Sequence, residues 1–64
     1  MIKIEFFGFY GKFVVRHIVE MEPMRRYPFI WARMYCKAIF GWYKSAYYAT
    51  ITICGKRQRV NRYE

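Results

Sequence analysis

Side chains that could do chemistry are few in this 64-residue chain, and they do not cluster along it. His17 is the single histidine, the side-chain type that titrates near neutral pH. A general base needs an oriented partner, and His17 lies on the apolar side of an alternating segment. We therefore expect a hydrogen-bonded structural histidine rather than a catalytic one.

The carboxylates offer one close pair. Glu20 and Glu22 lie two residues apart, so they share one face of an extended strand. Paired carboxylates can bind metal or serve hydrolysis. Here we expect the pair to offset Lys12 and Arg16 on the solvated side of a sheet. The other acids are Glu5 and Glu64.

The two cysteines, Cys36 and Cys54, form no CxxC pair and no cluster with histidine. A tetrahedral zinc site needs four ligands at workable spacing, which these residues do not supply. A disulfide between them is geometrically possible, but free thiols in the cytosol are the default interpretation. No glycine-rich phosphate loop, nucleophile elbow or metal signature occurs. The sequence therefore predicts a non-enzymatic protein with no metal and no cofactor.

Charge and aromatic content point to binding instead. Lys and Arg number 12 against 4 Asp and Glu, for a net charge of +8, and 23% of the residues are aromatic. Some of the rings serve the core, because a domain of this size buries only about 60% of its surface and needs large side chains. The charge repels itself, and an anionic partner would relieve that repulsion. Candidate partners are nucleic acid, an anionic membrane surface and an acidic protein face.

Hydrophobic periodicity predicts the elements that position these side chains. Residues 2–7 and 12–22 alternate as strands do, and glycines at both ends of 8–11 favour a hairpin loop. Pro23 ends the second strand, because proline cannot donate to a ladder. Pro28 fits the first position of a helix that runs to about residue 44. A third strand follows at 47–54, with a turn after it.

The same periods predict which residues face the core. In the second strand the apolar face contains Phe13, Val15, His17, Val19 and Met21. In the helix it contains Trp31, Met34, Tyr35, Ala38, Ile39 and Trp42, and in the third strand it begins at Tyr47.

One helix should therefore lie across one face of a mainly antiparallel sheet of three to four strands, a two-layer α+β fold of β-β-α-β order. A right-handed crossover places the third strand beside the first. Residues 1–55 form a single α+β domain in this interpretation. Residues 56–64 form a basic C-terminal tail or a short edge strand.

Three surfaces are candidates for binding. The first is a stripe on the outer side of the helix, where an exposed ring lies among cations without any acid. The second is the basic C-terminal segment, and the third is the hairpin tip. Rings beside cations grip nucleic-acid backbones and stack bases, or anchor protein interfaces. The residues are Arg26, Arg33, Lys37, Phe40 and Lys44 in the stripe, Lys56, Arg57, Arg59, Arg62 and Tyr63 in the C-terminal segment, and Phe9 and Tyr10 at the tip.

The hairpin at 2–21, the helical segment at 31–38 and the strand at 48–54 together have a layout that resembles a class of small bacteriophage-encoded proteins. These proteins disable host machinery, and they include inhibitors of bacterial RNA polymerase and some anti-CRISPR proteins. Many are acidic mimics of nucleic acid, a mechanism that the positive charge of this chain excludes. The resemblance implies a protein that plugs or clamps an acidic or nucleic-acid-lined surface in the host bacterial cytoplasm.

The leading hypothesis is a non-enzymatic, phage-type inhibitor that docks on a nucleic-acid-handling complex through its basic and aromatic surfaces. The alternative is a protein that binds DNA or RNA directly through the helix stripe and the C-terminal segment. A third is a small structural or assembly subunit.

Membrane binding is not expected, because no apolar run approaches the ~20 residues of a spanning helix. The apolar face of the helix is also already required by the sheet. No secretory signal is evident, which favours a cytoplasmic location.

Overall fold

The first and third strands form where residues that face the core alternate with residues that face away, because successive side chains of a strand point to opposite faces. The computed structural model describes residues 1–20 and 27–63. Its strands are β1 (Ile2–Phe7), β2 (Phe13–Val19), β3 (Tyr48–Ile53) and β4 (Lys56–Asn61). The expectations for Met21, Glu22, Pro23, Arg26 and Glu64 lie outside the described residues.

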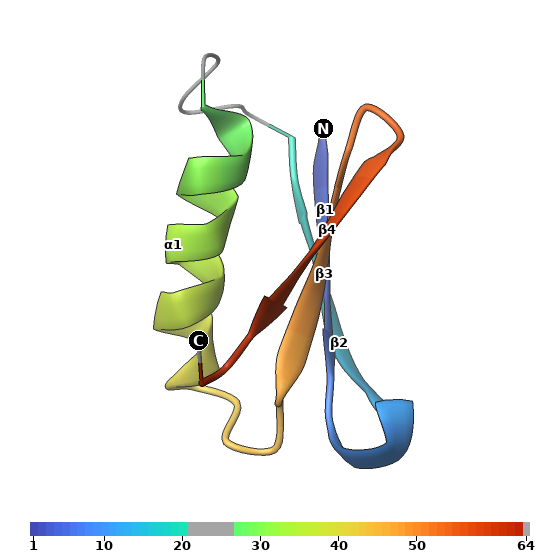
Figure 1. Ribbon diagram of the computed structural model, residues 1–64, viewed down its shortest axis with the longest axis vertical. Coiled ribbons are helices and arrows are strands. Elements are labelled where there is room, and N and C mark those ends of the chain that lie inside the picture. The colour runs from blue at the N-terminus through green and yellow to red at the C-terminus, as the bar shows by residue number, and fades with distance from the viewer. Residues whose placement is uncertain (21–26, 64) are drawn as a thin grey trace.

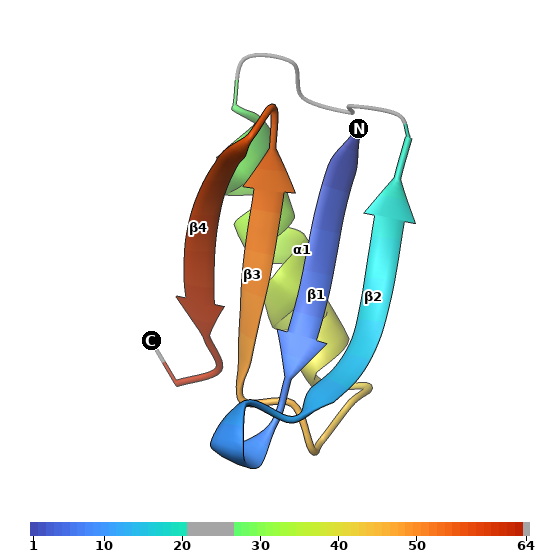
Figure 2. The same cartoon turned by 90° about the vertical axis from the view of Figure 1, so that its right-hand side faces the viewer.

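All four strands belong to one antiparallel sheet in the order β2-β1-β3-β4, which Figure 2 shows face-on. β1 pairs with β2 through the hairpin, and with β3 across the longer connection that contains the helix. The predicted position of the third strand beside the first is confirmed. β4 adds to the other side of β3, so most of the basic C-terminal segment is an edge strand.

The helix α1 (Pro28–Phe40) lies across one face of this sheet (Figure 1). Pro28 occupies the first turn, where its missing N–H costs no hydrogen bond. The helix ends at Phe40, before the predicted residue 44, because the Gly41 and Trp42 N–H groups close a final tight turn. The predicted two-layer α+β fold, one helix on a mainly antiparallel sheet, is confirmed. Within residues 1–20 and 27–63, no helix has the length and apolarity that crossing a membrane requires.

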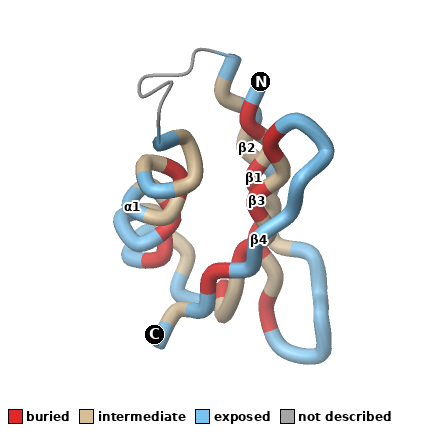
Figure 3. Tube along the Cα trace, turned by 45° about the horizontal axis from the view of Figure 1, so that its top comes forward, coloured by how far each residue is buried: buried red, intermediate tan, exposed pale blue. Residues whose placement is uncertain are grey.

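The core lies between α1 and the sheet, and it takes alternate residues of β1 and β3 together with Val60 of β4 (Figure 3). Along β1 and β3, buried residues alternate with half-buried ones. This alternation is expected of strands that have one face against a core. The buried residues are Ile2, Ile4, Phe6, Ala32, Cys36, Phe40, Ala46, Ala49, Ile51, Ile53 and Val60.

The face of α1 that meets the sheet differs from the predicted one. Ala32, Cys36 and Phe40 are buried, whereas Met34 and Trp42, predicted as core, are 67% and 81% exposed. Only two of the 13 helix residues are charged, so apolar residues occur on every side and periodicity does not define one face. The small side chains of Ala32 and Cys36 let the helix approach the sheet. Trp31, Tyr35 and Ile39 pack at the margin of the core, Tyr47 is half-buried, and Ala38 is exposed.

A β-bulge changes which residues of β2 face the helix. Phe6 pairs with Val15 and Phe7 pairs with Phe13, so Val14 is an extra residue in the ladder. The bulge turns Phe13 to the face away from α1, which corrects the prediction that Phe13 is a core residue. Val14 instead packs against the core. Val15, His17 and Val19 keep the predicted side.

The loop between β1 and β2 is a short 3-10 turn, η1 (Phe9–Gly11), and the predicted hairpin loop is confirmed. Positive φ falls on Tyr10 (58°) and Gly11 (70°), but Gly8 has an ordinary φ of −105°. Gly8 is required for a close approach instead. A Cβ at this position would lie 2.6 Å from the carbonyl oxygen of Ser45. The hairpin therefore rests directly on the loop that follows α1.

Candidate functional site

The face of the sheet opposite α1 is covered by no other element of the described chain (Figures 1 and 2). The strand register places its side chains in three rows, each of which crosses β2, β1, β3 and β4. We call these residues the outer face. The rows are Phe13, Phe7, Tyr48 and Asn61, then Arg16, Glu5, Thr50 and Arg59, then Ile18, Lys3, Thr52 and Arg57.

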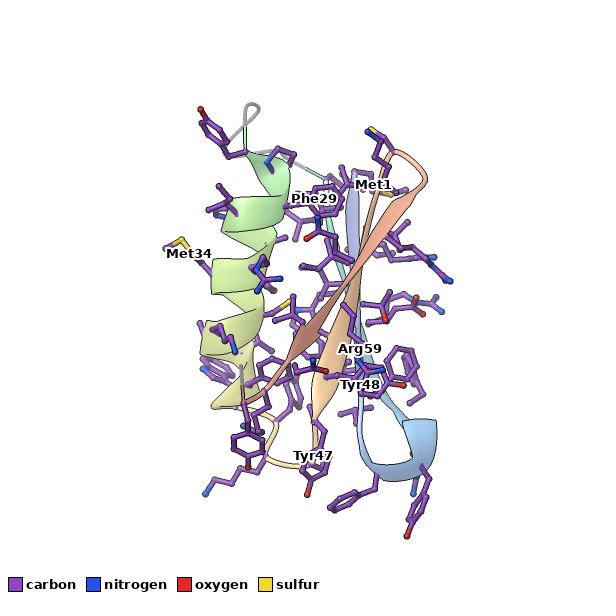
Figure 4. All side chains as sticks on the ribbon, viewed as in Figure 1. Met1, Phe29, Met34, Tyr47, Tyr48 and Arg59 are labelled. Atoms are coloured by element: carbon purple, nitrogen blue, oxygen red, sulfur yellow. The ribbon has the colours of Figure 1, made fainter. Side chains whose placement is uncertain are left out.

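The first row is a continuous line of rings. The centroids of Phe13 and Phe7 are 6.0 Å apart in an edge contact, and those of Phe7 and Tyr48 are 5.2 Å apart with the planes 18° from parallel. The Arg59 guanidinium carbon lies 3.9 Å from the centroid of the Tyr48 ring. Figure 4 shows Tyr48 and Arg59 together on the side of the sheet away from α1. The line therefore ends in a cation stacked on a ring.

Arg59 is held in that place by a second contact. Its Nε donates to Asn61 Oδ1 at 2.9 Å, two residues along the same strand. The hydrogen bond and the ring contact together hold the guanidinium over the Tyr48 ring. One side of the guanidinium meets Tyr48, and Arg59 as a whole is exposed.

Cations outnumber acids on the outer face. Its one acid among the strand residues is Glu5, whose side chain is 14% exposed and accepts from Arg16 Nη2 at 3.3 Å. Lys3 Nζ lies 3.9 Å from the other Glu5 oxygen. Arg57 and Arg59 add two more cations on β4. The outer face therefore has a net positive charge, and Glu5 is mostly buried and paired with Arg16.

The predicted stripe on the back of the helix does not exist as a cationic surface around an exposed ring. Phe40 is 3% exposed and belongs to the core, where its ring meets Phe6 edge-on at 5.5 Å. Lys37 Nζ donates to the carbonyl oxygens of Asn61 and Arg62 at 2.8 and 3.3 Å. Lys37 thus joins α1 to the end of β4. Arg33 is half-buried, and Lys44 is exposed in the loop after the helix.

Arg62 proves to be a structural residue. Its guanidinium donates to the carbonyl oxygens of Phe40, Tyr43 and Ala46 at 2.6 to 2.9 Å. These carbonyls belong to the last turn of α1 and the loop after it, which lack helical partners. Arg62 therefore caps the helix and is not available to an outside ligand.

The other basic residues of the C-terminal segment divide between the two faces of β4. Val60 is buried under α1, so alternation sends Arg57 and Arg59 to the outer face and Lys56 to the opposite one. Tyr63 follows the strand and is exposed. Of the predicted segment, the structure brings only Arg57 and Arg59 to the outer face, and of these two Arg59 contacts the line of rings.

Phe9 and Tyr10, the candidate binding residues of the hairpin tip, are both exposed. Phe9 also packs on Tyr47, with the centroids 4.0 Å apart. Beside this pair is a hollow of about 370 Å³ between the β1–β2 turn and the loop after α1. Its lining residues are Gly8, Phe9, Lys12, Phe13, Val14, Ser45 and Tyr47.

The sequence reasoning missed Phe7, Phe13, Tyr48, Lys3 and Arg16 as site residues. A signal existed in the sequence. Lys3 and Phe7 alternate with Ile4 and Phe6 in β1, and Tyr48 alternates with Tyr47, where the predicted apolar face of the third strand begins. The predicted strand order would then have set Phe7 beside Tyr48. Phe13 could not be found, since the bulge at Val14 leaves no mark in the pattern.

Three titratable side chains, His17, Tyr35 and Cys36, lie in the core or pack at its margin. His17 Nδ1 lies 2.6 Å from the Tyr35 hydroxyl, which agrees with the predicted hydrogen-bonded histidine. Burial raises the pKa of Cys36 to about 12, against the opposing effect of Arg33 and Lys37. Burial also raises the pKa of Tyr35, helped by Cys36 and Tyr43.

Cys36 and Cys54 are both free, the first buried and the second exposed. Among the described residues, no group of three or more His, Cys, Asp or Glu side chains could hold a metal ion. Comparison with models of known protein families, with curated protein sequences and with solved structures found no match.

Proposed function

We propose that this protein binds single-stranded nucleic acid on the outer face of its sheet. The observation that carries the proposal is the line of Phe13, Phe7 and Tyr48, which ends in the stacked Arg59 and is bordered by cations. Open four-stranded sheets with exposed rings stack unpaired bases in this way. Paired bases are not available for such stacking, so single strands are preferred over duplexes.

The residues divide the work between bases and phosphates. Phe13 is exposed, and its ring offers a flat surface to a base. The guanidinium of Arg59 offers a second stacking surface on the side away from Tyr48. Arg57, Lys3 and Arg59 provide charges for the phosphates. These side chains stack on the faces of bases and do not hydrogen-bond to base edges, so little sequence preference is expected.

Fluorescence anisotropy with an oligothymidylate tests the proposal. Phe13→Ala should weaken binding about tenfold, since stacking contributes roughly 1–3 kcal/mol per base. The matched control is Trp42→Ala, which removes an exposed ring away from the outer face and should leave affinity unchanged. Equal losses in both variants, or no binding of the wild type at low salt, would sink the proposal.

A second candidate function is docking on a nucleic-acid-handling protein complex, as the layout of phage inhibitors implies. The supporting observation is the outward side of α1, where Ile30 and Met34 are exposed, with Trp42 just beyond the helix end. Figure 4 shows Met34 pointing away from the sheet. A helix that is apolar on all sides is normally buried on all sides. Exposed apolar surface of this kind marks interaction sites.

An affinity pull-down from bacterial lysate, with and without nuclease, separates the two functions. A protein captured by the wild type in both conditions, and lost in Met34→Glu, supports docking. Capture that disappears with nuclease supports nucleic-acid binding. Light scattering over a concentration range tests the third hypothesis, a structural or assembly subunit, which requires a size that grows with concentration.

A further inference from the structure

We propose that the hollow at the hairpin end of the molecule binds one nucleobase, the terminal base of a strand lying on the outer face. This inference rests on the proposed nucleic-acid binding and adds a distinct subsite to it. The hollow has a volume of about 370 Å³, and pockets for small organic ligands measure about 300–1,000 Å³.

The hollow is continuous with the line of rings. Phe13 is one of its lining residues, and the ring of Phe13 also contacts Phe7 on the outer face. A strand whose base stacks on the exposed ring of Phe13 therefore reaches the hollow with its next base. Figure 4 places Tyr47, on the far wall, at the end of the molecule that carries the β1–β2 turn.

The lining suits a flat ring attached to an anion. Phe9 and Tyr47 form an aromatic wall, with their centroids 4.0 Å apart and planes 41° from parallel. Val14 adds an aliphatic surface, and Lys12 is the one charged residue among the described residues of the lining. A half-open, mostly apolar hollow with one cation in its lining matches a base and its phosphate. The exposed Ser45 adds a hydroxyl that can donate to or accept from a base edge.

Backbone hydrogen bonds hold the walls in place. Gly8 N–H donates to Lys12 O at 2.7 Å, and Lys12 N–H donates to Phe9 O at 3.1 Å. On the other wall, Tyr47 N–H donates to Phe7 O at 2.7 Å. The absence of a side chain at Gly8 lets the two walls meet. A preformed site loses less conformational freedom when it binds a ligand.

The test uses the shortest oligothymidylate that retains full affinity, so that the strand cannot slide. Each base in turn is replaced by an abasic residue, and binding is measured by anisotropy to the wild type and to Ser45→Phe, whose ring fills the hollow. We expect Ser45→Phe to lower the affinity for the intact strand about tenfold. When the base that enters the hollow is missing, the hollow no longer contributes to binding. Ser45→Phe and the wild type should therefore bind a strand that is abasic at that terminal position equally well, because base and hollow act as a coupled pair.

Phe9→Ala and Lys12→Gln are the second and third variants, and circular dichroism verifies that each variant is folded. Phe9→Ala should show the same coupling to the same terminal position. Lys56→Gln, an exposed cation in β4, is the matched control for Lys12→Gln and should show no coupling.

Three other results overturn the inference. If every abasic position lowers affinity equally and Ser45→Phe binds the intact strand as the wild type does, the subsite is contradicted but the proposed function is not. Coupling to an interior position would likewise contradict a terminal subsite. If the wild type binds no intact strand at low salt, the proposed function fails and the subsite fails with it.

Discussion

Arg62 is the residue on which the end of the helix depends. Its guanidinium donates to three carbonyl oxygens that would otherwise lack partners, and hydrogen bonds to charged groups contribute about 1.5–3 kcal/mol. Arg62→Ala should therefore lower the free energy of unfolding by about 2–3 kcal/mol, measured from the midpoint in urea. Arg57→Ala, an exposed arginine on the outer face, is the control and should change it little. Arg62→Lys should recover only part of the loss, since lysine cannot span three carbonyls.

The two thiols should behave in opposite ways. Cys54 is exposed and Cys36 is buried, so a thiol reagent should modify one cysteine in the native protein and the second only after unfolding. The raised pKa of Cys36, about 12 against an ordinary 9, also predicts a pH effect. The unfolded chain loses this proton above pH 9 while the folded chain keeps it.

The stability contributed by the protonated Cys36 is therefore complete below pH 9 and is lost as the pH rises toward 12. The largest slope from one proton is about 1.4 kcal/mol per pH unit. Urea titrations between pH 9 and 11 measure this slope. The free energy of unfolding of Cys36→Ala should fall less steeply with pH than that of the wild type. Parallel slopes in the two proteins would contradict the assignment to Cys36.

At the scale of elements, α1 offers a direct comparison between two aromatic residues. Phe40→Ala should destabilise the protein by about 3–5 kcal/mol, because a buried ring leaves a cavity. Trp42→Ala should stay within about 0.5 kcal/mol, because Trp42 is exposed. Thermal or urea unfolding of the two variants decides the matter. A larger loss of stability in Trp42→Ala than in Phe40→Ala would instead support the helix face that the sequence predicted.

The strands could be predicted from the sequence, but the orientation of the helix could not. β1 and β3 alternate cleanly, and each has one face of Ile, Ala or Phe against a face that carries polar side chains. In α1 the large residues Trp31 and Met34 were predicted to fill the core. The space between helix and sheet instead admits Ala32 and Cys36. The distance between two layers is a tertiary property that periodicity does not contain.

At the scale of the whole molecule, the net charge of +8 predicts that the affinity for nucleic acid falls as the salt concentration rises. The outer face carries Lys3, Arg16, Arg57 and Arg59, with Arg16 engaged by Glu5. Each phosphate contact contributes about 0.7 to the log–log slope on single strands, so we expect a slope of about −2 to −3. Arg57→Gln should reduce the slope by about 0.7. An affinity that does not change with salt would contradict binding on this face.

The candidate site could be predicted only in part. Composition indicated that rings and cations act together, and Arg57 and Arg59 were among the predicted binding residues. The surface on which they act comes from the register of four strands, which combines residues as distant in the sequence as Lys3 and Arg57. Phe40 and Arg62 were assigned to binding because a sequence shows the type of a side chain but not its partner.

The pairing of β1 with β3 has a consequence for the order in which the chain folds. Each hairpin joins neighbouring segments, whereas Ile2 meets Ile53 only after the whole intervening chain is in place. Closing the longer loop costs more entropy, and such distant pairings slow folding. We therefore expect two hairpins that form early and a rate-limiting step in which β1 and β3 meet. Interactions formed after that step, the Arg62 cap among them, would set how slowly the protein unfolds rather than how quickly it folds.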